Sequence, residues 1–137
     1  MSDCITPVVA ALIFNKDGKI LAARRRKNLS NGGKWEFPGG KLRPGEVPED
    51  CLRREIFEEF RVKIIPRRLF QVVNYHAESG NILLIGYTCN FDAGDFRLSD
   101  HDQIKWMNVQ NLLELDFSPA DIPLARQLVS GISDEDE

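Results

Sequence analysis

The stretch Pro48–Phe60 combines a hydrophobic stripe with a row of carboxylates on one predicted helix. Proline suits a first helical position, and the two acidic residues that follow it favour the positive end of the helix dipole. Apolar side chains recur at every fourth position, at Leu52, Ile56 and Phe60. A stripe with this spacing is predicted to face a core, so the helix must pack against another layer of the protein.

Glu55, Glu58 and Glu59 stand at positions i, i+3 and i+4 of this helix, beside the apolar stripe. They occupy an arc of about 100°, and like charges one turn apart destabilise a bare helix. Arg54 can pair with Glu58, but one arginine cannot neutralise three glutamates. A divalent cation can, and Mg²⁺ prefers oxygen ligands of this kind. The alternative is a solvated acidic face, which is the usual nature of a charge run.

The loop before the helix favours the cation-binding interpretation. Its segment 37–40, Phe-Pro-Gly-Gly, brings bare backbone close to the carboxylates. Gly39 or Gly40 can present a carbonyl oxygen to an ion without a side chain in the way. Glu46 adds another carboxylate just before the helix. A plain turn is the alternative, but it does not account for a turn that opens onto three glutamates.

Strands and helices are predicted to mix without regular alternation along the rest of the chain. Strands are expected over residues 6–14, 19–23, 35–37, 67–76, 82–91 and 104–108, and helices over 109–115 and 119–130. Regular structure is expected to stop at the Pro-Gly-Gly of residues 38–40. This pattern favours an α+β fold, with a mixed β-sheet packed between helices, over a doubly wound parallel sheet.

The length and charge of the chain describe one domain with a short tail. A chain of 137 residues leaves little room for a second domain. The net charge is −3 and becomes +1 when the four acidic residues 134–137 are set aside. We expect residues 1–132 to form the domain and residues 133–137 to be an acidic, disordered tail.

Composition also limits the partners and the compartment. No apolar run approaches the roughly 18 residues of a membrane helix, and the basic leader of a signal peptide is missing. The single basic run, residues 24–27, is too small to indicate binding of a nucleic-acid polymer, but it could bind a small anionic ligand. Cys4, Cys51 and Cys89 lack metal-ligand spacing, which indicates free thiols in a reducing cytoplasm. We expect a cytoplasmic protein, either a monomer or a homodimer.

The segment from Gly40 to Val62 resembles the Nudix box, G-x5-E-x7-R-E-U-x-E-E-x-G-U, in which U is aliphatic. Both aliphatic positions match, and the segments 35–41 and 118–123 also resemble the MutT-type branch of that family. Arg61 departs from the box, because the family has a glycine that ends the helix in a left-handed conformation. We expect this change to cost about 1 kcal/mol or less. Six of the seven fixed residues match: Gly40, Glu46, Arg54, Glu55, Glu58 and Glu59.

The resemblance implies a Nudix-type α/β/α sandwich and a Mg²⁺-dependent hydrolase, with Mn²⁺ able to replace Mg²⁺. Water would attack a nucleoside triphosphate and release the monophosphate and pyrophosphate. Arg54 would orient a glutamate through a charge-assisted hydrogen bond. Glu46 would not bind the ion itself but would contact residues that do. One carboxylate must accept the proton of the water, and the pattern leaves open which one does so. The implied metal ligands are Glu55, Glu58, Glu59, a carbonyl of Gly39 or Gly40, and Asp100.

The resemblance also implies contacts to the substrate. Arg24, at the end of the second predicted strand, would bind phosphate, although a solvated basic run is equally compatible, and Lys41 is a second candidate. Asp121 corresponds to the position that reads the edge of the base, where a carboxylate suits an exocyclic amine. It could instead cap the last helix.

Aromatic and histidine side chains indicate ligand binding less strongly than the residues of the box. Trp35, Phe37 and Tyr75 are candidates to stack on a base, although aromatic residues near a strand are more often core. His76 and His101 have no zinc-ligand spacing, and we expect both at the surface.

Three functions are compatible with these residues. The first is a nucleoside triphosphate pyrophosphohydrolase that cleans the nucleotide pool, acting on cytidine-type or oxidised purine nucleotides. The second is a Nudix hydrolase of another nucleoside diphosphate derivative, such as a dinucleotide or a nucleotide sugar. The third is a non-catalytic nucleotide-binding module, against which the intact carboxylates argue.

Overall fold

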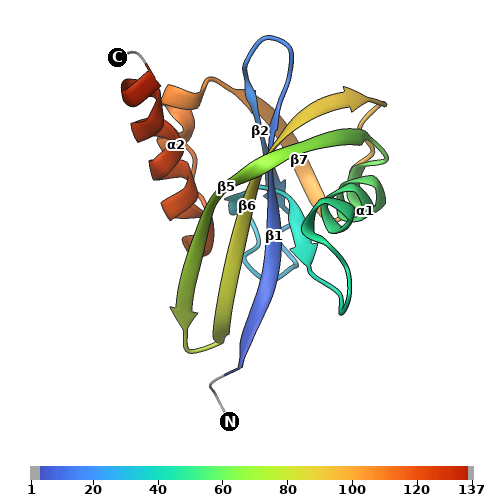
Figure 1. Cartoon of the computed structure of the whole chain (residues 1–137), viewed down its shortest axis with the longest axis vertical. Coiled ribbons are helices and arrows are strands. Elements are labelled where there is room, and N and C mark those ends of the chain that lie inside the picture. The colour runs from blue at the N-terminus through green and yellow to red at the C-terminus, as the bar shows by residue number, and fades with distance from the viewer. Residues whose placement is uncertain (1–3, 136–137) are drawn as a thin grey trace.

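The computed structural model describes residues 4–135, and it describes side chains for residues 4–131. Seven strands and two α-helices make up its regular structure, with two 3₁₀ segments before the second helix (Figure 1). The elements in chain order are β1 (Ile5–Phe14), β2 (Ile20–Arg25), β3 (Trp35–Glu36), β4 (Gly39–Lys41), α1 (Pro48–Phe60), β5 (Lys63–Ala77), β6 (Gly80–Ala93), β7 (His101–Met107), η1 (Val109–Glu114), η2 (Pro119–Asp121) and α2 (Ile122–Glu135).

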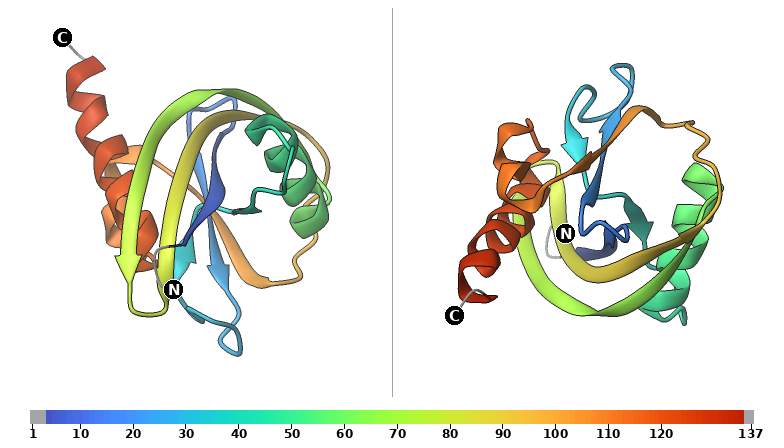
Figure 2. Two further views of the ribbon diagram at one scale, coloured as in Figure 1. Left: turned by 60° about the horizontal axis from the view of Figure 1, so that its bottom comes forward. Right: turned by 90° about the horizontal axis from the view of Figure 1, so that it is seen from above.

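The seven strands form one mixed sheet, as the sequence predicted. Its main path runs β3-β2-β1-β6-β5, with β4 also paired to β1 and β7 also paired to β2. Strands β1 and β6 are parallel, and the other pairs are antiparallel. The curved sheet lies between α1 and α2, which cover opposite sides (Figures 1 and 2). The expected α+β sandwich is therefore confirmed.

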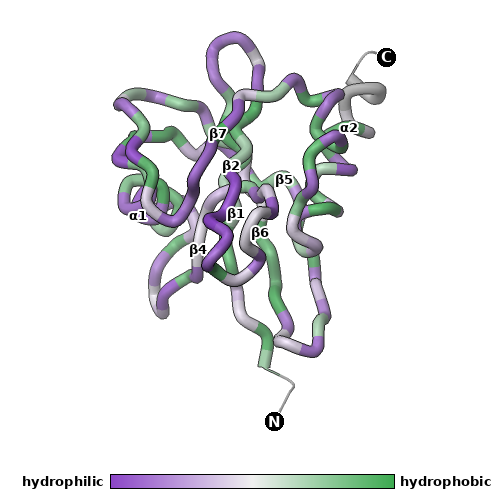
Figure 3. The backbone as a smooth tube through the Cα atoms, turned by 180° about the vertical axis from the view of Figure 1, so that it is seen from behind, coloured by the Kyte–Doolittle hydropathy of each residue, from purple (hydrophilic) through white to green (hydrophobic). Residues whose placement is uncertain are grey.

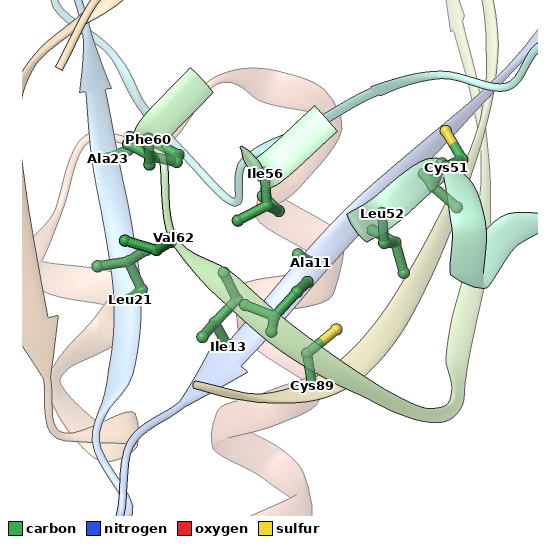
Figure 4. Close-up of a cluster of buried hydrophobic side chains, with 12 residues drawn as sticks. Ala11, Ile13, Leu21, Ala23, Cys51, Leu52, Ile56, Phe60, Val62 and Cys89 are labelled. Atoms are coloured by element: carbon green, nitrogen blue, oxygen red, sulfur yellow. The ribbon is translucent and has the colours of Figure 1, made fainter. Parts of the chain in front are cut away.

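Strand β1 lies in the middle of the main path, and its residues Val9–Ile13 are buried on both faces. Its side chains alternate between two hydrophobic clusters, because successive residues of a strand point to opposite sides of a sheet. Ala11 and Ile13 meet the apolar stripe of α1 in the first cluster (Figure 4). Leu12 packs with Leu124 of α2 in the second cluster. The coloured parts of both helices alternate between hydrophobic and hydrophilic positions (Figure 3), as helices that cover a sheet do.

Helix α1 has the predicted bounds, and its three stripe residues are fully buried. The long strands differ from the prediction. Strand β5 begins at Lys63 and includes Pro66, which is accommodated because the pairing with β6 shifts register there. The turn between these two strands shrinks to Glu78 and Ser79.

The expectation that regular structure stops at Pro38-Gly39-Gly40 is wrong, because Gly39 and Gly40 belong to β4. They pair with Ala10 and Val9 of β1. A Cβ atom on Gly39 would lie 1.8 Å from the carbonyl oxygen of Val9. The glycine that suggested a break in the sequence is therefore what allows this strand to approach β1.

The segments after β7 are also shaped differently from the prediction. The expected helix over residues 109–115 is a 3₁₀ segment, and the last α-helix begins at Ile122 and runs to Glu135. The end of the expected acidic tail, residues 136–137, lies outside the described residues. The cysteines are free thiols, as expected. Neither α-helix of the described chain has the length and hydrophobicity that crossing a bilayer requires.

Arg61 ends α1 in the left-handed conformation that the box assigns to its glycine, with φ 61° and ψ 28°. Its N–H donates to the carbonyl oxygen of Phe57 at 2.9 Å. Its guanidinium lies 5.4 Å from the centre of the Phe57 ring, which offsets part of the backbone strain.

We expect Arg61→Gly to stabilise the protein slightly, by about 1 kcal/mol or less, and to leave turnover unchanged. Glycine relieves the left-handed strain but loses the ring contact and gains entropy in the unfolded chain. Arg61→Ala is the matched control, because alanine keeps the strain and also loses the ring contact. Urea unfolding should rank Gly above Ala by about 1 kcal/mol. Equal stability of the two variants would show that the backbone at this position is not strained.

Candidate active site

Arg54 connects the glutamates of α1 with the loop that precedes the helix. Its Nε and Nη2 donate to the two carboxylate oxygens of Glu46 at 2.8 and 2.9 Å, a bidentate pair. Its Nη1 lies 3.0 Å from Glu55 and 3.4 Å from Glu58. These bonds to Arg54 lower the pKa of Glu46 to about 2. Arg54 therefore holds one glutamate in place while facing two others.

Gly40 is required by the position of the Glu55 carboxylate. A Cβ atom on residue 40 would lie 2.2 Å from Cδ of Glu55, so the carboxylate packs directly on the glycine backbone. Any side chain at this position would displace it. The structure thus brings the predicted glycine and the first predicted metal-binding glutamate into contact.

The other two glutamates of the box differ in their environment. Glu58 is 53% exposed, whereas Glu59 is only 12% exposed. Burial, followed by the charges of Glu36 and Glu55, raises the pKa of Glu59 to about 9. Its Oε2 atom is buried and has no hydrogen-bond partner. A buried carboxylate oxygen without a partner is costly, and a cation would satisfy it.

Within the part of the chain that the structure describes, the acidic and histidine ligand atoms that converge belong to Glu36, Glu59 and His101. These atoms lie within 4.8 Å of one another. Glu55 and Glu58 share a helix face with Glu59 but are not part of this cluster. The sequence predicted only Glu59 of the three.

The expectation that His101 lies at the surface is wrong, since its side chain has no exposed area. The imidazole stacks on Phe60 at 5.1 Å, and Nε2 lies 2.7 Å from Oε2 of Glu36. His101 is brought there because β7 pairs with β2, which places it opposite Arg25. That pairing left no signal in the sequence. His76 is exposed, as expected.

A cavity of about 360 Å³ opens beside these residues. Five of the predicted site residues line it: Phe37, Gly39, Gly40, Lys41 and Asp121. Arg25 and Glu36 also line it and were not predicted. A neighbouring hollow of about 250 Å³ is lined by Lys41 and by Tyr75, another predicted contact. Trp35 is instead buried in the core, as is the body of Phe37, whose ring packs on Phe117 at 4.9 Å.

The side chain of Arg24, a predicted phosphate ligand, does not line the cavity. Its Nε donates to Asp102 at 2.8 Å, whereas the neighbouring Arg25 lines the cavity. The pairing of β2 with β7 shifts register between these two arginines, and such bulges change the direction of side chains. Asp100 is exposed; its carbonyl oxygen accepts from the N–H of Arg26, and its charge contributes to the raised pKa of Glu59.

Asp121 is buried at the edge of the cavity, 7% exposed. The hydroxyl of Ser118 donates to its Oδ2 at 2.5 Å. Burial nevertheless raises the pKa of Asp121 to about 7. Asp121 lines the same cavity as Gly39 and Gly40, and its contact with a base stays a prediction.

The raised pKa of Asp121 predicts a pH dependence of stability. The contribution of the protonated carboxyl is fully present below about 3.8, the unfolded value, and is lost as the pH rises through about 7. We expect Asp121→Asn to remove this decline, which amounts to about 4 kcal/mol at most. The measurement is the free energy of unfolding of both proteins from pH 4 to 8 without metal. Parallel curves would mean that Asp121 titrates normally.

Comparison with known proteins gives consistent matches. A family model described as the NUDIX domain matches residues 5–128. The CTP pyrophosphohydrolase of Escherichia coli (strain K12) is 34% identical over 118 residues, which cover 85% of this chain and 86% of that protein. The 8-oxo-dGTP diphosphatase of the same strain is 31% identical over 123 residues, 88% of this chain and 94% of that protein. The crystal structure of a MutT protein from Methanosarcina mazei Go1 superposes with a TM-score of 0.85 at 26% identity, covering 100% of this chain and 99% of that one.

Proposed function

Because the chain belongs to the Nudix family, we propose that it hydrolyses a nucleoside triphosphate to the monophosphate and pyrophosphate with the help of Mg²⁺. The observation that carries this proposal is the cavity of about 360 Å³, which joins the Gly39–Lys41 strand to Asp121. One end offers backbone and charged groups, and the other offers a buried carboxylate. A triphosphate and a base need such an arrangement of groups.

The glutamates of α1 fit a divalent cation. The unpartnered Oε2 of Glu59 and the contact of Glu55 with the Gly40 backbone both place oxygen atoms where a cation would be favourable. When bound, such an ion would offset the phosphate charges and acidify the attacking water. Glu55, Glu58 and Glu59 are the proposed ligands, with a carbonyl of Gly39 or Gly40. Asp100 is a further proposed ligand.

The remaining residues have positioning roles in this proposal. Arg54 holds Glu46 and faces Glu55, which keeps the carboxylate array in one arrangement. Arg25 and Lys41 line the cavity and supply positive charge for the phosphates. Arg25 thus takes the role that the sequence predicted for Arg24.

Asp121 is the proposed reader of the base. A carboxylate accepts hydrogen bonds, so it suits a base with an exocyclic amine, such as cytosine. The similarity to a CTP pyrophosphohydrolase supports cytidine-type substrates, and the similarity to an 8-oxo-dGTP diphosphatase supports oxidised purines. The proposal includes a cytoplasmic location and a small nucleotide, rather than a nucleic-acid polymer, as the partner.

Release of pyrophosphate from a panel of substrates tests the proposal. The panel should hold CTP, dCTP, UTP and 8-oxo-dGTP beside a dinucleotide and a nucleotide sugar, with and without Mg²⁺. We expect Mg²⁺-dependent pyrophosphate from one or more triphosphates. Cleavage confined to the dinucleotide or the nucleotide sugar would assign a different substrate class, and no cleavage of any member would contradict the enzymatic function.

A further inference from the structure

A buried imidazole lies between two carboxylates beside the cavity. His101 has no exposed area, and its Nε2 lies 2.7 Å from Oε2 of Glu36. Its Nδ1 lies 3.9 Å from Oε1 of Glu59 and has no hydrogen-bond partner. Oε2 of Glu59 is buried and unpartnered as well. Two buried polar atoms on facing side chains are thus left unsatisfied, and each such atom costs about 1–3 kcal/mol.

The contact with Glu36 determines which nitrogen of His101 carries the proton. A carboxylate can only accept, so the nitrogen at 2.7 Å from it must be Nε2–H. In the neutral ring Nδ1 then carries a lone pair, and this atom lies 3.9 Å from Oε1 of Glu59. A second proton, on Nδ1, would not form a hydrogen bond with Glu59, because the distance of 3.9 Å from Nδ1 to Oε1 is too long.

We propose that His101 Nδ1 and Glu59 together bind a divalent cation, and that this mixed nitrogen and oxygen pair favours transition metals such as Mn²⁺, Co²⁺ or Zn²⁺ over Mg²⁺. The gap of 3.9 Å is slightly shorter than two metal–ligand bonds of about 2.1 Å end to end, so an ion fits between the two groups. The inference rests on the proposed metal-binding role of Glu59, but not on the identity of the substrate.

The surroundings of His101 are those of a metal ligand. Histidines that bind metals generally donate their other ring N–H to a carboxylate, which fixes the ring and its tautomer, and Glu36 accepts this bond here. The negative charges of Glu55 and Asp100 act on Glu59 and favour a cation. Arg25 is the opposing positive charge, but it lies 3.5 Å from Glu36 rather than at Glu59.

The donor atoms decide the preference among metals. Mg²⁺ takes oxygen ligands almost exclusively, whereas imidazole nitrogen suits Zn²⁺ and the other first-row transition ions. Glu36, which accepts from Nε2 of His101, lines the cavity of about 360 Å³, so the pair lies one residue away from the proposed substrate site. The result is a site whose occupant depends on the metal supply and not only on Mg²⁺.

Pulsed electron paramagnetic resonance of the Mn²⁺-loaded protein tests the proposal directly. We expect a ¹⁴N coupling typical of coordinated imidazole in the wild type, converted to the ¹⁵N pattern when the histidines are labelled. His101→Gln should remove the coupling. His76→Gln is the matched control, because His76 is exposed on another strand, and it should leave the coupling intact. Absence of a histidine coupling in the wild type would overturn the proposal, whether or not the variants fold.

Metal affinity gives a second measurement. Calorimetric titration with Co²⁺ should show binding weakened by about 10- to 100-fold in Glu36→Gln, since the hydrogen bond that fixes the imidazole is altered. Mg²⁺ affinity should change by less than the Co²⁺ affinity. An equal loss for both metals would contradict a nitrogen ligand. Pyrophosphate release with Mg²⁺ is scored separately, so failure of this inference and failure of the proposed function are distinguishable.

Discussion

Glu59→Gln is expected to lower turnover with saturating Mg²⁺ by about 100-fold or more while the protein stays folded. The substitution keeps the volume of the side chain but removes the negative charge that the most buried glutamate of the box would present to a bound ion. Charge stabilisation by a metal site is worth several kcal/mol in the transition state, and each 1.4 kcal/mol is a factor of ten. Glu58→Gln is expected to lower turnover strongly as well.

Thermal melting separates this loss from unfolding. Without metal, the melting temperature of Glu59→Gln should equal or exceed that of the wild type, because the variant no longer buries a group whose pKa is raised to about 9. Mg²⁺ should raise the melting temperature of the wild type more than that of the variant. Glu78→Gln makes the same chemical change at an exposed turn and should alter neither quantity. Near-normal turnover of Glu59→Gln would remove it from the metal site.

Asp121→Ala is expected to change which base the protein prefers, by about 10- to 100-fold in relative kcat/KM. A hydrogen bond to a charged group is worth about 1.5–3 kcal/mol, and the ratio of CTP to UTP turnover isolates it because phosphate contacts are common to both substrates. The CTP preference of the wild type should also grow as the pH rises through about 7, where Asp121 becomes a carboxylate. Asp121→Asn should show a flat profile.

Ser118→Ala is the control for this experiment. It removes the hydroxyl that donates to Asp121 but leaves the carboxylate in place. We expect it to shift the pH at which the preference changes, without abolishing the preference. If Asp121→Ala instead lowers kcat/KM equally for CTP and UTP, Asp121 supports the fold and does not read the base.

Local periodicity explains why α1 was predictable to the residue. A helix fixes the angle between neighbours, so the spacing of Leu52, Ile56 and Phe60 determines that they share a face. The same geometry determines that the three glutamates lie on the adjoining face. The left-handed position after α1 was indicated only by the resemblance to the box, which has glycine there, and the structure shows that Arg61 adopts it.

The direction of side chains on the strands was harder to predict from the sequence. Arg24 and Arg25 are neighbouring arginines of the same strand, and the structure places only Arg25 on the cavity, at the point where the β2–β7 pairing shifts register. Likewise, Gly39 and Gly40 look like a break in the sequence, but their pairing with β1 makes them a strand. Pairing partners are far away in the chain, so no short pattern encodes them.

By itself, the sequence determined the helix, its row of glutamates, the mixed sheet and the free thiols, because each depends on spacing or composition that neighbouring residues carry. Only the tertiary structure decided that Glu36, Glu59 and His101 meet. These residues come from β3, α1 and β7, and the alignment of β3 and β7 on either edge of β2 places two of them beside the helix. The physical reason is that strand pairing joins distant segments through backbone hydrogen bonds, which any residue except proline can donate and which therefore leave little trace in the side chains.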